Sequence, residues 1–149
     1  MDNLKSKHKR IQPLIKIRKA QLDEETLALN AIRAEKMKAL GELRKNQELY
    51  IKGVDDINRT RQSRDTRNLL TLESGLDLVK SQWYSALKEV RMVEEKEKAQ
   101  LMQLMIAQRN LKSLERLADR YDIQLNEAFK KEEQKILDEN AARNYKRNA

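Results

Sequence analysis

The sequence predicts an all-α protein in which two long helices fold back on each other as an antiparallel coiled-coil hairpin. Apolar residues repeat every seven positions over most of the chain, charged residues make up 38%, aromatic residues only 4%, and there are three glycines and one proline. This combination is typical of long helices stabilised along a narrow apolar stripe rather than around a thick globular core. A segment without apolar residues, 58–64, separates the two periodic regions and predicts the connection between them.

The second helix is predicted over about 66–140, where no proline occurs. Steps of seven from Leu69 and from Leu72 define two tracks, and eight of the ten residues on each track are apolar. Residues at this spacing occupy the a and d positions of a coiled coil, which face a partner helix. A helix of seventy residues would be about 105 Å long. The polar exceptions on the two tracks are Glu97, Gln100, Glu132 and Lys135.

The first helix is predicted over about 13–58. Pro13 suits a first helical turn, where a missing N–H costs nothing, but the helix can also begin near Asp2 or Asn3 and bend at the proline. One heptad track is apolar at six of its seven positions, which are Ile15, Leu22, Leu29, Lys36, Leu43, Tyr50 and Ile57.

The companion track of this first helix, taken four residues further along, is weaker. Leu40 and Val54 fit it, but Lys19, Arg33 and Gln47 on the same track are polar. Ile32 and Met37 are apolar but lie outside both tracks. Gly53 lies inside the helix and weakens it by about 1 kcal/mol relative to Ala. A glycine also lets another backbone come close, but local weakness is the preferred interpretation.

A short connection, 59–65, returns the second helix antiparallel to the first. Residues 141–149 lose the heptad pattern and are predicted to form a frayed basic tail. The whole chain, 1–149, is then a single helical-hairpin domain.

Positive charge is concentrated at both chain ends. The formal net charge is +8, and residues 1–20 hold seven Lys and Arg against one Asp, while residues 141–149 add three Lys and Arg and no acid. A hairpin brings both ends to one basic tip, which suits an acidic partner, although charged tails can also simply solubilise a thin coiled coil. If the first helix begins at Pro13, Leu117 to Ile136 stay unpaired, whereas a helical 2–12 would cover part of that stretch.

Several kinds of chemistry are excluded. The chain has no cysteine and one histidine, His8, so disulfides, thiolate sites and multi-His metal sites are not possible, and the lack of cysteine fits a reducing cytosol. Neither a phosphate-binding glycine loop nor a calcium loop is present. The N-terminus lacks the apolar run of a signal peptide, and the longest uncharged stretch, 99–108, is half of what a membrane span needs. We expect a soluble protein that is not an enzyme, holds no cofactor or metal and does not insert into a membrane.

The last helical residues resemble the closing pattern of the FliJ/YscO family, the helical-hairpin stalk proteins of bacterial type III secretion. The pattern consists of Glu133-Gln134-Lys135, Asp138-Glu139, Ala141 and Arg143. The start of the chain is similar too, with a basic lead followed by Ile15, Arg18, Lys19 and Leu22. The length, the hairpin layout and the basic character of the chain also match this family over the whole chain. The tail RNYKRNA resembles that of injectisome members, which serve virulence, more than that of flagellar members.

The resemblance implies a non-enzymatic stalk at the cytoplasmic face of the secretion apparatus. Its terminal end would enter the hexameric secretion ATPase, and the other end would face the export gate and export chaperones. The residues expected to contact the ATPase are Lys9, Arg10, Arg18, Arg120, Lys130 and Lys131. Those expected to contact the gate or chaperones are Tyr50, Ile57, Leu72 and Leu76.

We therefore expect a monomeric hairpin stalk. A homo-oligomeric coiled-coil scaffold or tether is the alternative, and a monomeric mass in solution separates the two. Binding of nucleic acid by the basic termini is a minor interpretation, since only Tyr145 places an aromatic among those charges and no recognition motif is present.

Overall fold

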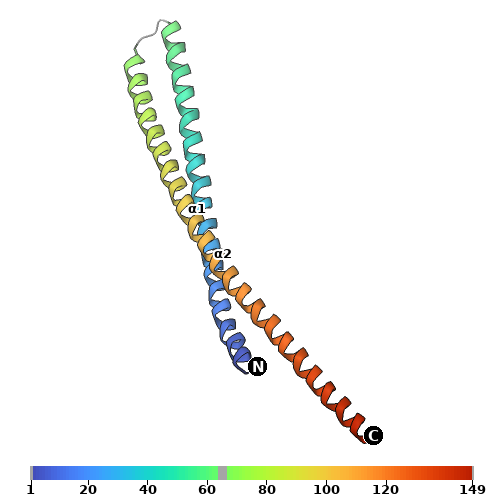
Figure 1. Ribbon diagram of the computed structural model, residues 1–149. Helices are drawn as coiled ribbons and strands as arrows, with labels where there is room; N and C mark the ends of the chain where they lie inside the picture. Colours follow the sequence, from blue (N-terminus) through green and yellow to red (C-terminus); the bar gives the residue numbers. More distant parts are fainter. Residues whose placement is uncertain (1, 64–66, 149) are drawn as a thin grey trace. The chain divides into compact units, whose positions relative to one another are not determined.

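The computed structural model describes residues 2–63 and 67–148, which form two helices, α1 (Asp2–Gln62) and α2 (Leu69–Asn148). The helices run in opposite directions and pack against each other as a helical hairpin (Figure 1). The prediction of an all-α hairpin is confirmed. Among the described residues, neither helix contains a stretch apolar enough to cross a membrane.

The chain divides into two compact units, each containing parts of both helices. One, here called the terminal unit, comprises Met1–Glu24 and Met105–Ala149, and the other, the loop unit, comprises Glu25–Leu104. Each unit is described separately below. That residues 1–149 form a single domain stays a prediction.

Helix α1 begins at Asp2, so the predicted start near residue 13 is wrong and the earlier start is correct. Pro13 lies inside the helix, is exposed, and removes one backbone hydrogen bond at a cost of about 3 kcal/mol. On either side of it, Ile11 and Ile15 are only 4% and 8% exposed. Burial of each isoleucine contributes about 1.5–3 kcal/mol, which offsets the cost of the proline. Asp2 adds a favourable charge in the first turn.

Helix α2 continues to Asn148, so the predicted frayed tail at 141–149 is wrong for the residues that the structure describes. No glycine or proline follows Gly75, and Lys146 and Arg147 in the last turn favour the negative end of the helix dipole. The connection also falls later than predicted, between Gln62 and Leu69. At the end of α1, the Ser63 hydroxyl donates to the Thr60 carbonyl at 2.9 Å.

The two predicted tracks of α2 are confirmed as its packed face. From Leu69 to Ala128, every position on both tracks is buried or half-buried, while Glu132 and Lys135, further along the same tracks, are exposed. The heptad repeat therefore marks the extent of helix pairing as well as its face, because the tracks become exposed where they turn polar at the end of the helix.

The predicted companion track of α1 is wrong by one residue. The packed positions follow three residues after the first track, and they are Ile11, Arg18, Glu25, Ile32, Ala39, Asn46, Gly53 and Thr60, all buried or half-buried. Lys19, Arg33 and Gln47 are exposed, and Ile32, which was placed outside both tracks, packs in the core of the loop unit. Polar residues occupy half of this track, so hydrophobicity alone did not identify it.

Gly53 lies on this packed track and leaves room for a neighbour. A Cβ built at this position would lie 2.8 Å from Leu76 Cδ1, whereas at Gly41 and Gly75 nothing lies within 4 Å. The preferred interpretation of Gly53 as a simple weak point is therefore incomplete. The glycine allows a leucine side chain of α2, rather than its backbone, to approach α1 closely.

Candidate partner-binding surfaces

The terminal unit is held together by an apolar cluster. Ile11, Ile15, Leu111 and Ala118 are at most 8% exposed and pack with half-buried neighbours, which are Leu22, Leu114, Leu117 and Tyr121. Two of the buried side chains come from each helix. Residues 2–12 of α1 therefore cover part of the α2 stripe that a helix starting at Pro13 would leave unpaired.

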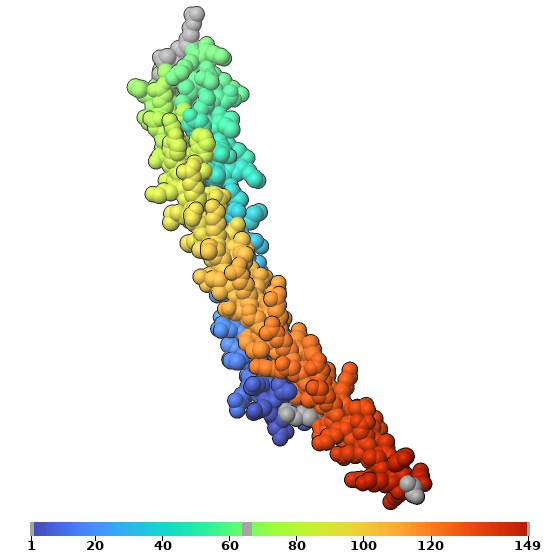
Figure 2. Space-filling model, viewed as in Figure 1, coloured from blue at the N-terminus to red at the C-terminus, as the bar shows by residue number. Residues whose placement is uncertain are grey.

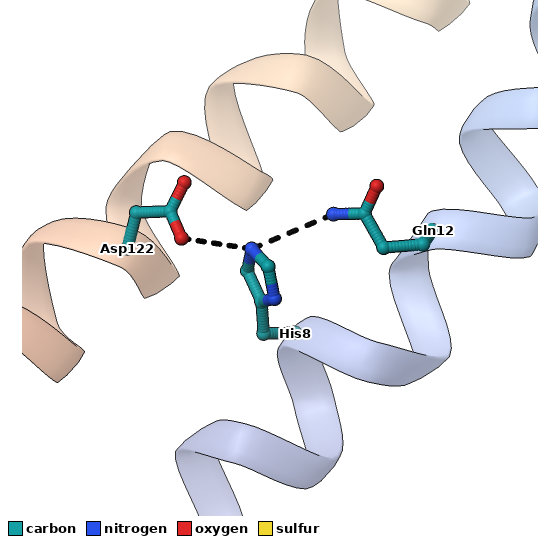
Figure 3. A network of polar contacts seen from close by, with 3 residues as sticks. All are labelled: His8, Gln12 and Asp122. Carbon is teal, nitrogen blue, oxygen red and sulfur yellow. Dashed lines mark hydrogen bonds and ion pairs between the residues drawn. The ribbon is translucent and has the colours of Figure 1, made fainter.

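Polar contacts extend this pairing towards the N-terminus. His8 Nε2 lies 2.8 Å from Asp122 Oδ1 and 3.5 Å from Gln12 Nε2, so one imidazole nitrogen contacts a side chain from each helix (Figure 3). The Lys5 ammonium lies 5.2 Å from the centre of the Phe129 ring, within range of a cation–π interaction. These contacts lie near the surface and position the first turns of α1 on α2.

Beyond these contacts, the last part of α2 has no covering helix. Every described side chain from Phe129 to Asn148 is exposed, including Ile136 at 53% and Leu137 at 61%. In Figure 2 this segment, in red, extends past the blue start of α1. An uncovered helix with exposed apolar and basic side chains is a candidate partner surface.

The residues predicted to contact the ATPase all belong to the terminal unit. Five of them are exposed, namely Lys9, Arg10, Arg120, Lys130 and Lys131. Arg18 is half-buried on the packed track, and its guanidinium donates to Gln21 Oε1 at 3.0 Å. The five exposed cations are free to face a partner, while Arg18 also supports the hairpin.

The loop unit combines a small apolar cluster with polar pairs. The buried residues of this cluster are Ala39, Val90 and Val93, and Leu29 and Ile57 are buried elsewhere in the unit. Two of the four polar exceptions on the α2 tracks, Glu97 and Gln100, lie in this unit, and both are paired across the hairpin. Glu97 lies 3.4 Å from Lys36 Nζ, and the Gln100 amide donates to the Glu25 carbonyl at 3.1 Å and to the Glu25 carboxylate.

The residues predicted to contact the gate or chaperones lie in the loop unit and on the packed faces of its helices. Ile57 is 5% exposed, and Tyr50, Leu72 and Leu76 are half-buried. The Tyr50 ring packs against Trp83, with 5.2 Å between ring centres. Most of their surface therefore holds the two helices together, and their role in partner binding stays a prediction.

Other apolar residues of the same region are exposed. They flank the packed faces and are Leu49, Ile51, Leu70, Leu78 and Tyr84, with exposures from 43% to 79%. The Tyr84 ring stacks on Trp83 at 6.2 Å between centres and 5° between planes, and no hydrogen-bond partner of the buried Trp83 Nε1 lies in the described chain. The heptad pattern pointed only to the packed positions. Apolar residues that directly precede or follow a packed position in the sequence were the signal that could have indicated a partner surface.

Among residues 2–63 and 67–148, no group of three or more His, Cys, Asp or Glu could hold a metal ion. Paired helices with exposed cations and apolar flanks define a class, the coiled-coil hairpin that acts by contacting other proteins.

The comparison with protein families is more specific. The family model described as "Flagellar FliJ protein" matches residues 7–149, and the chain belongs to the FliJ family. Membership implies a stalk-like role in the type III export apparatus and binding to the export ATPase ring, and proteins of this family are non-enzymatic structural components. No curated protein and no solved structure matches the chain. The prediction of the family is confirmed.

Proposed function

We propose that this protein is a monomeric stalk of a bacterial type III secretion system, whose terminal unit enters the hexameric secretion ATPase from the cytoplasmic side. The supporting observation is that the start of α1 and the later part of α2 belong to one unit that is rich in exposed cations. The terminal unit contains seventeen Lys and Arg against eleven Asp and Glu. An excess of positive charge favours an acidic pore and accelerates the encounter with it.

The uncovered end of α2 is the second feature that supports insertion. Lys130 and Lys131 follow Phe129, and Ile136 and Leu137 lie about two turns further along. A segment that exposes both cations and apolar side chains can gain from electrostatic attraction and from apolar burial inside a ring. Because a single hairpin has no rotational symmetry, it contacts the six subunits of the ring unequally.

The loop unit is proposed to face the export gate and the export chaperones. Tyr50, Ile57, Leu72 and Leu76 form the packed support of this surface, since little of their own area is exposed. The direct contacts are then made by the exposed residues that flank them, above all Leu70, Leu78 and Tyr84. The hairpin joins the ATPase to the gate without catalysing a reaction itself.

The experiment uses the full chain and the secretion ATPase of the same organism. The triple variant Arg120→Glu, Lys130→Glu and Lys131→Glu is expected to weaken binding at least about tenfold and to abolish any change in ATP hydrolysis. The matched control reverses three exposed cations of the loop unit, Lys80→Glu, Lys88→Glu and Arg91→Glu, and is expected to bind normally. Equal loss in both variants, or no binding by the unmodified chain, contradicts the proposal.

The assignment to an injectisome rather than a flagellar apparatus rests on the tail RNYKRNA. In an organism with both systems, the chain is expected to co-purify with the injectisome ATPase. Capture by the flagellar ATPase alone contradicts this assignment and leaves the stalk role intact.

A homo-oligomeric scaffold is the second candidate, and the exposed Ile136 and Leu137 favour it. Light scattering after size-exclusion chromatography separates the two functions. The stalk predicts the mass of one chain, 17.6 kDa, and the scaffold predicts a multiple of it.

A further inference from the structure

A groove runs along one side of the loop unit, between α1 at residues 35–46 and α2 at residues 85–93. Its volume is about 510 Å³. The floor contains small aliphatic side chains, Ala39, Ala86 and Val93, of which Ala39 and Val93 are 8% and 3% exposed. Because larger residues occupy most other seam positions, this is a place where the paired helices leave space for a side chain from outside.

The rim of the groove is acidic in a chain that is otherwise basic. Glu35, Glu42 and Glu89 line it, with Lys38 as the only cation. Glu35 lies 3.8 Å from Lys96, whereas no ion pair joins Glu42 or Glu89 to another residue of the described chain. The loop unit as a whole holds fifteen Lys and Arg against thirteen Asp and Glu, so a rim with three carboxylates and one ammonium is more acidic than the unit that contains it.

We propose that this groove docks an amphipathic helix of a partner protein. A large apolar side chain of that helix lies over Ala39 and Ala86, and Lys or Arg side chains beside it pair with Glu42 and Glu89. Two paired helices with a groove between them are the usual receptor for a third helix, whose anchors recur at i, i+3, i+4 and i+7. The charge of the rim selects a basic helix over an acidic one.

A second copy of this chain is a poorer occupant. Its uncovered segment, the end of α2, alternates charge, since Glu132 and Glu133 directly follow Lys130 and Lys131. Docked on the groove, this segment would bring carboxylates as well as cations to Glu42 and Glu89, whereas a uniformly basic helix brings cations alone. The proposal is independent of the contact with the ATPase, because the groove lies entirely in the loop unit.

The test measures binding of two synthetic helices of about 21 residues to the full chain by fluorescence anisotropy. Both carry leucine at i, i+3, i+4 and i+7, and one has Lys and the other Glu at the flanking positions. The Lys peptide is expected to bind and the Glu peptide to bind at least about tenfold more weakly. The Lys peptide is also expected to bind less tightly as salt rises.

Two variants locate the site. Glu42→Gln with Glu89→Gln is expected to weaken binding of the Lys peptide at least about tenfold. Ser85→Arg, at an exposed position on the groove, is expected to block it by filling the space with a cation. The matched control, Glu48→Gln with Glu95→Gln, removes two exposed carboxylates of the same helices outside the groove and is expected to bind normally.

Three results of the peptide experiment overturn the proposal. They are absence of binding by the Lys peptide, binding that survives Glu42→Gln with Glu89→Gln, and equal binding of the Lys and Glu peptides. A dimer of the chain that dissociates in the Glu42→Gln, Glu89→Gln variant also overturns it, because the occupant would then be a second copy.

Discussion

The terminal unit and the loop unit share one heptad repeat, but they join their helices with different side chains. The terminal unit buries Ile11, Ile15, Leu111 and Ala118 and places the cross-helix contact between His8 and Asp122 near the surface. The loop unit buries Leu29, Ala39, Ile57, Val90 and Val93, and polar side chains pair across its packed faces, Lys36 with Glu97 and Glu25 with Gln100. Both units therefore gain stability from buried apolar side chains, and the loop unit adds polar pairs that favour one register of the two helices.

The largest difference is expected for a buried leucine. Leu111→Ala removes a side chain that is 8% exposed and should lower the free energy of unfolding by about 2–4 kcal/mol. The control, Leu78→Ala, truncates a leucine of the same helix that is 61% exposed and should change it by less than about 0.5 kcal/mol. Urea unfolding followed by circular dichroism measures both. Similar losses at the two positions would refute the assignment of the packed face.

The polar pair of the loop unit is expected to show coupling. Glu25→Leu or Gln100→Leu alone leaves one half-buried polar group without its partner and should destabilise the hairpin by about 1–3 kcal/mol. The double variant should recover most of this loss or exceed wild-type stability. If the pair fixes the register, the double variant should also form oligomers that light scattering detects. Additive losses without any coupling would show that the two residues act separately.

The three glycines provide an internal comparison. Gly41→Ala and Gly75→Ala should each raise stability by about 0.5–1 kcal/mol, because both positions are open and alanine favours the helix. Gly53→Ala should give no gain, since its Cβ would lie 2.8 Å from Leu76 Cδ1. Thermal unfolding monitored by circular dichroism distinguishes them. An equal gain at all three sites would mean that Leu76 moves aside freely.

The smallest effect is expected at the edge of the terminal unit. Asp122→Ala removes the ion pair with His8, whose side chains are 30% and 56% exposed, and should cost less than about 1 kcal/mol. Its signature is local, because amide hydrogen exchange should accelerate in residues 2–12 and stay unchanged in the loop unit. Asp119→Ala, at an exposed position three residues earlier, is the control. Equal acceleration of exchange in both variants would show that the contact between Asp122 and His8 does not hold residues 2–12 in place.

The sequence was sufficient to predict the parts of the fold that depend on apolar periodicity. Leu69 and Leu72 started two tracks whose packed extent is confirmed as far as Ala128. The second track of α1 was missed because the polar residues Arg18, Glu25 and Asn46 occupy it. Glu25 pairs with Gln100 across the hairpin, and such a pairing is visible only in the folded structure. The start of α1 was ambiguous at Pro13, because the cost of the proline is offset by contacts with α2 that lie far away in the sequence.

The candidate sites were predictable to a smaller extent. Basic side chains such as Lys9, Arg120 and Lys130 could be placed by counting charge along the two helices, and the structure finds them exposed in the terminal unit. The groove beside Ala39 and Ala86 could not be predicted in this way. It depends on which small residues face each other, and this requires the register of the pairing.

The most direct test of the account is whether residues 8 and 122 of one chain are neighbours. The chain has no cysteine, so His8→Cys with Asp122→Cys introduces two unique thiols. Treatment of the dilute protein with a short bismaleimide should give an internal cross-link at the mass of one chain, and Glu73→Cys in place of Asp122→Cys should give none. Cross-links found only between two chains, or equally with position 73, would contradict the antiparallel hairpin from which the stalk role is argued.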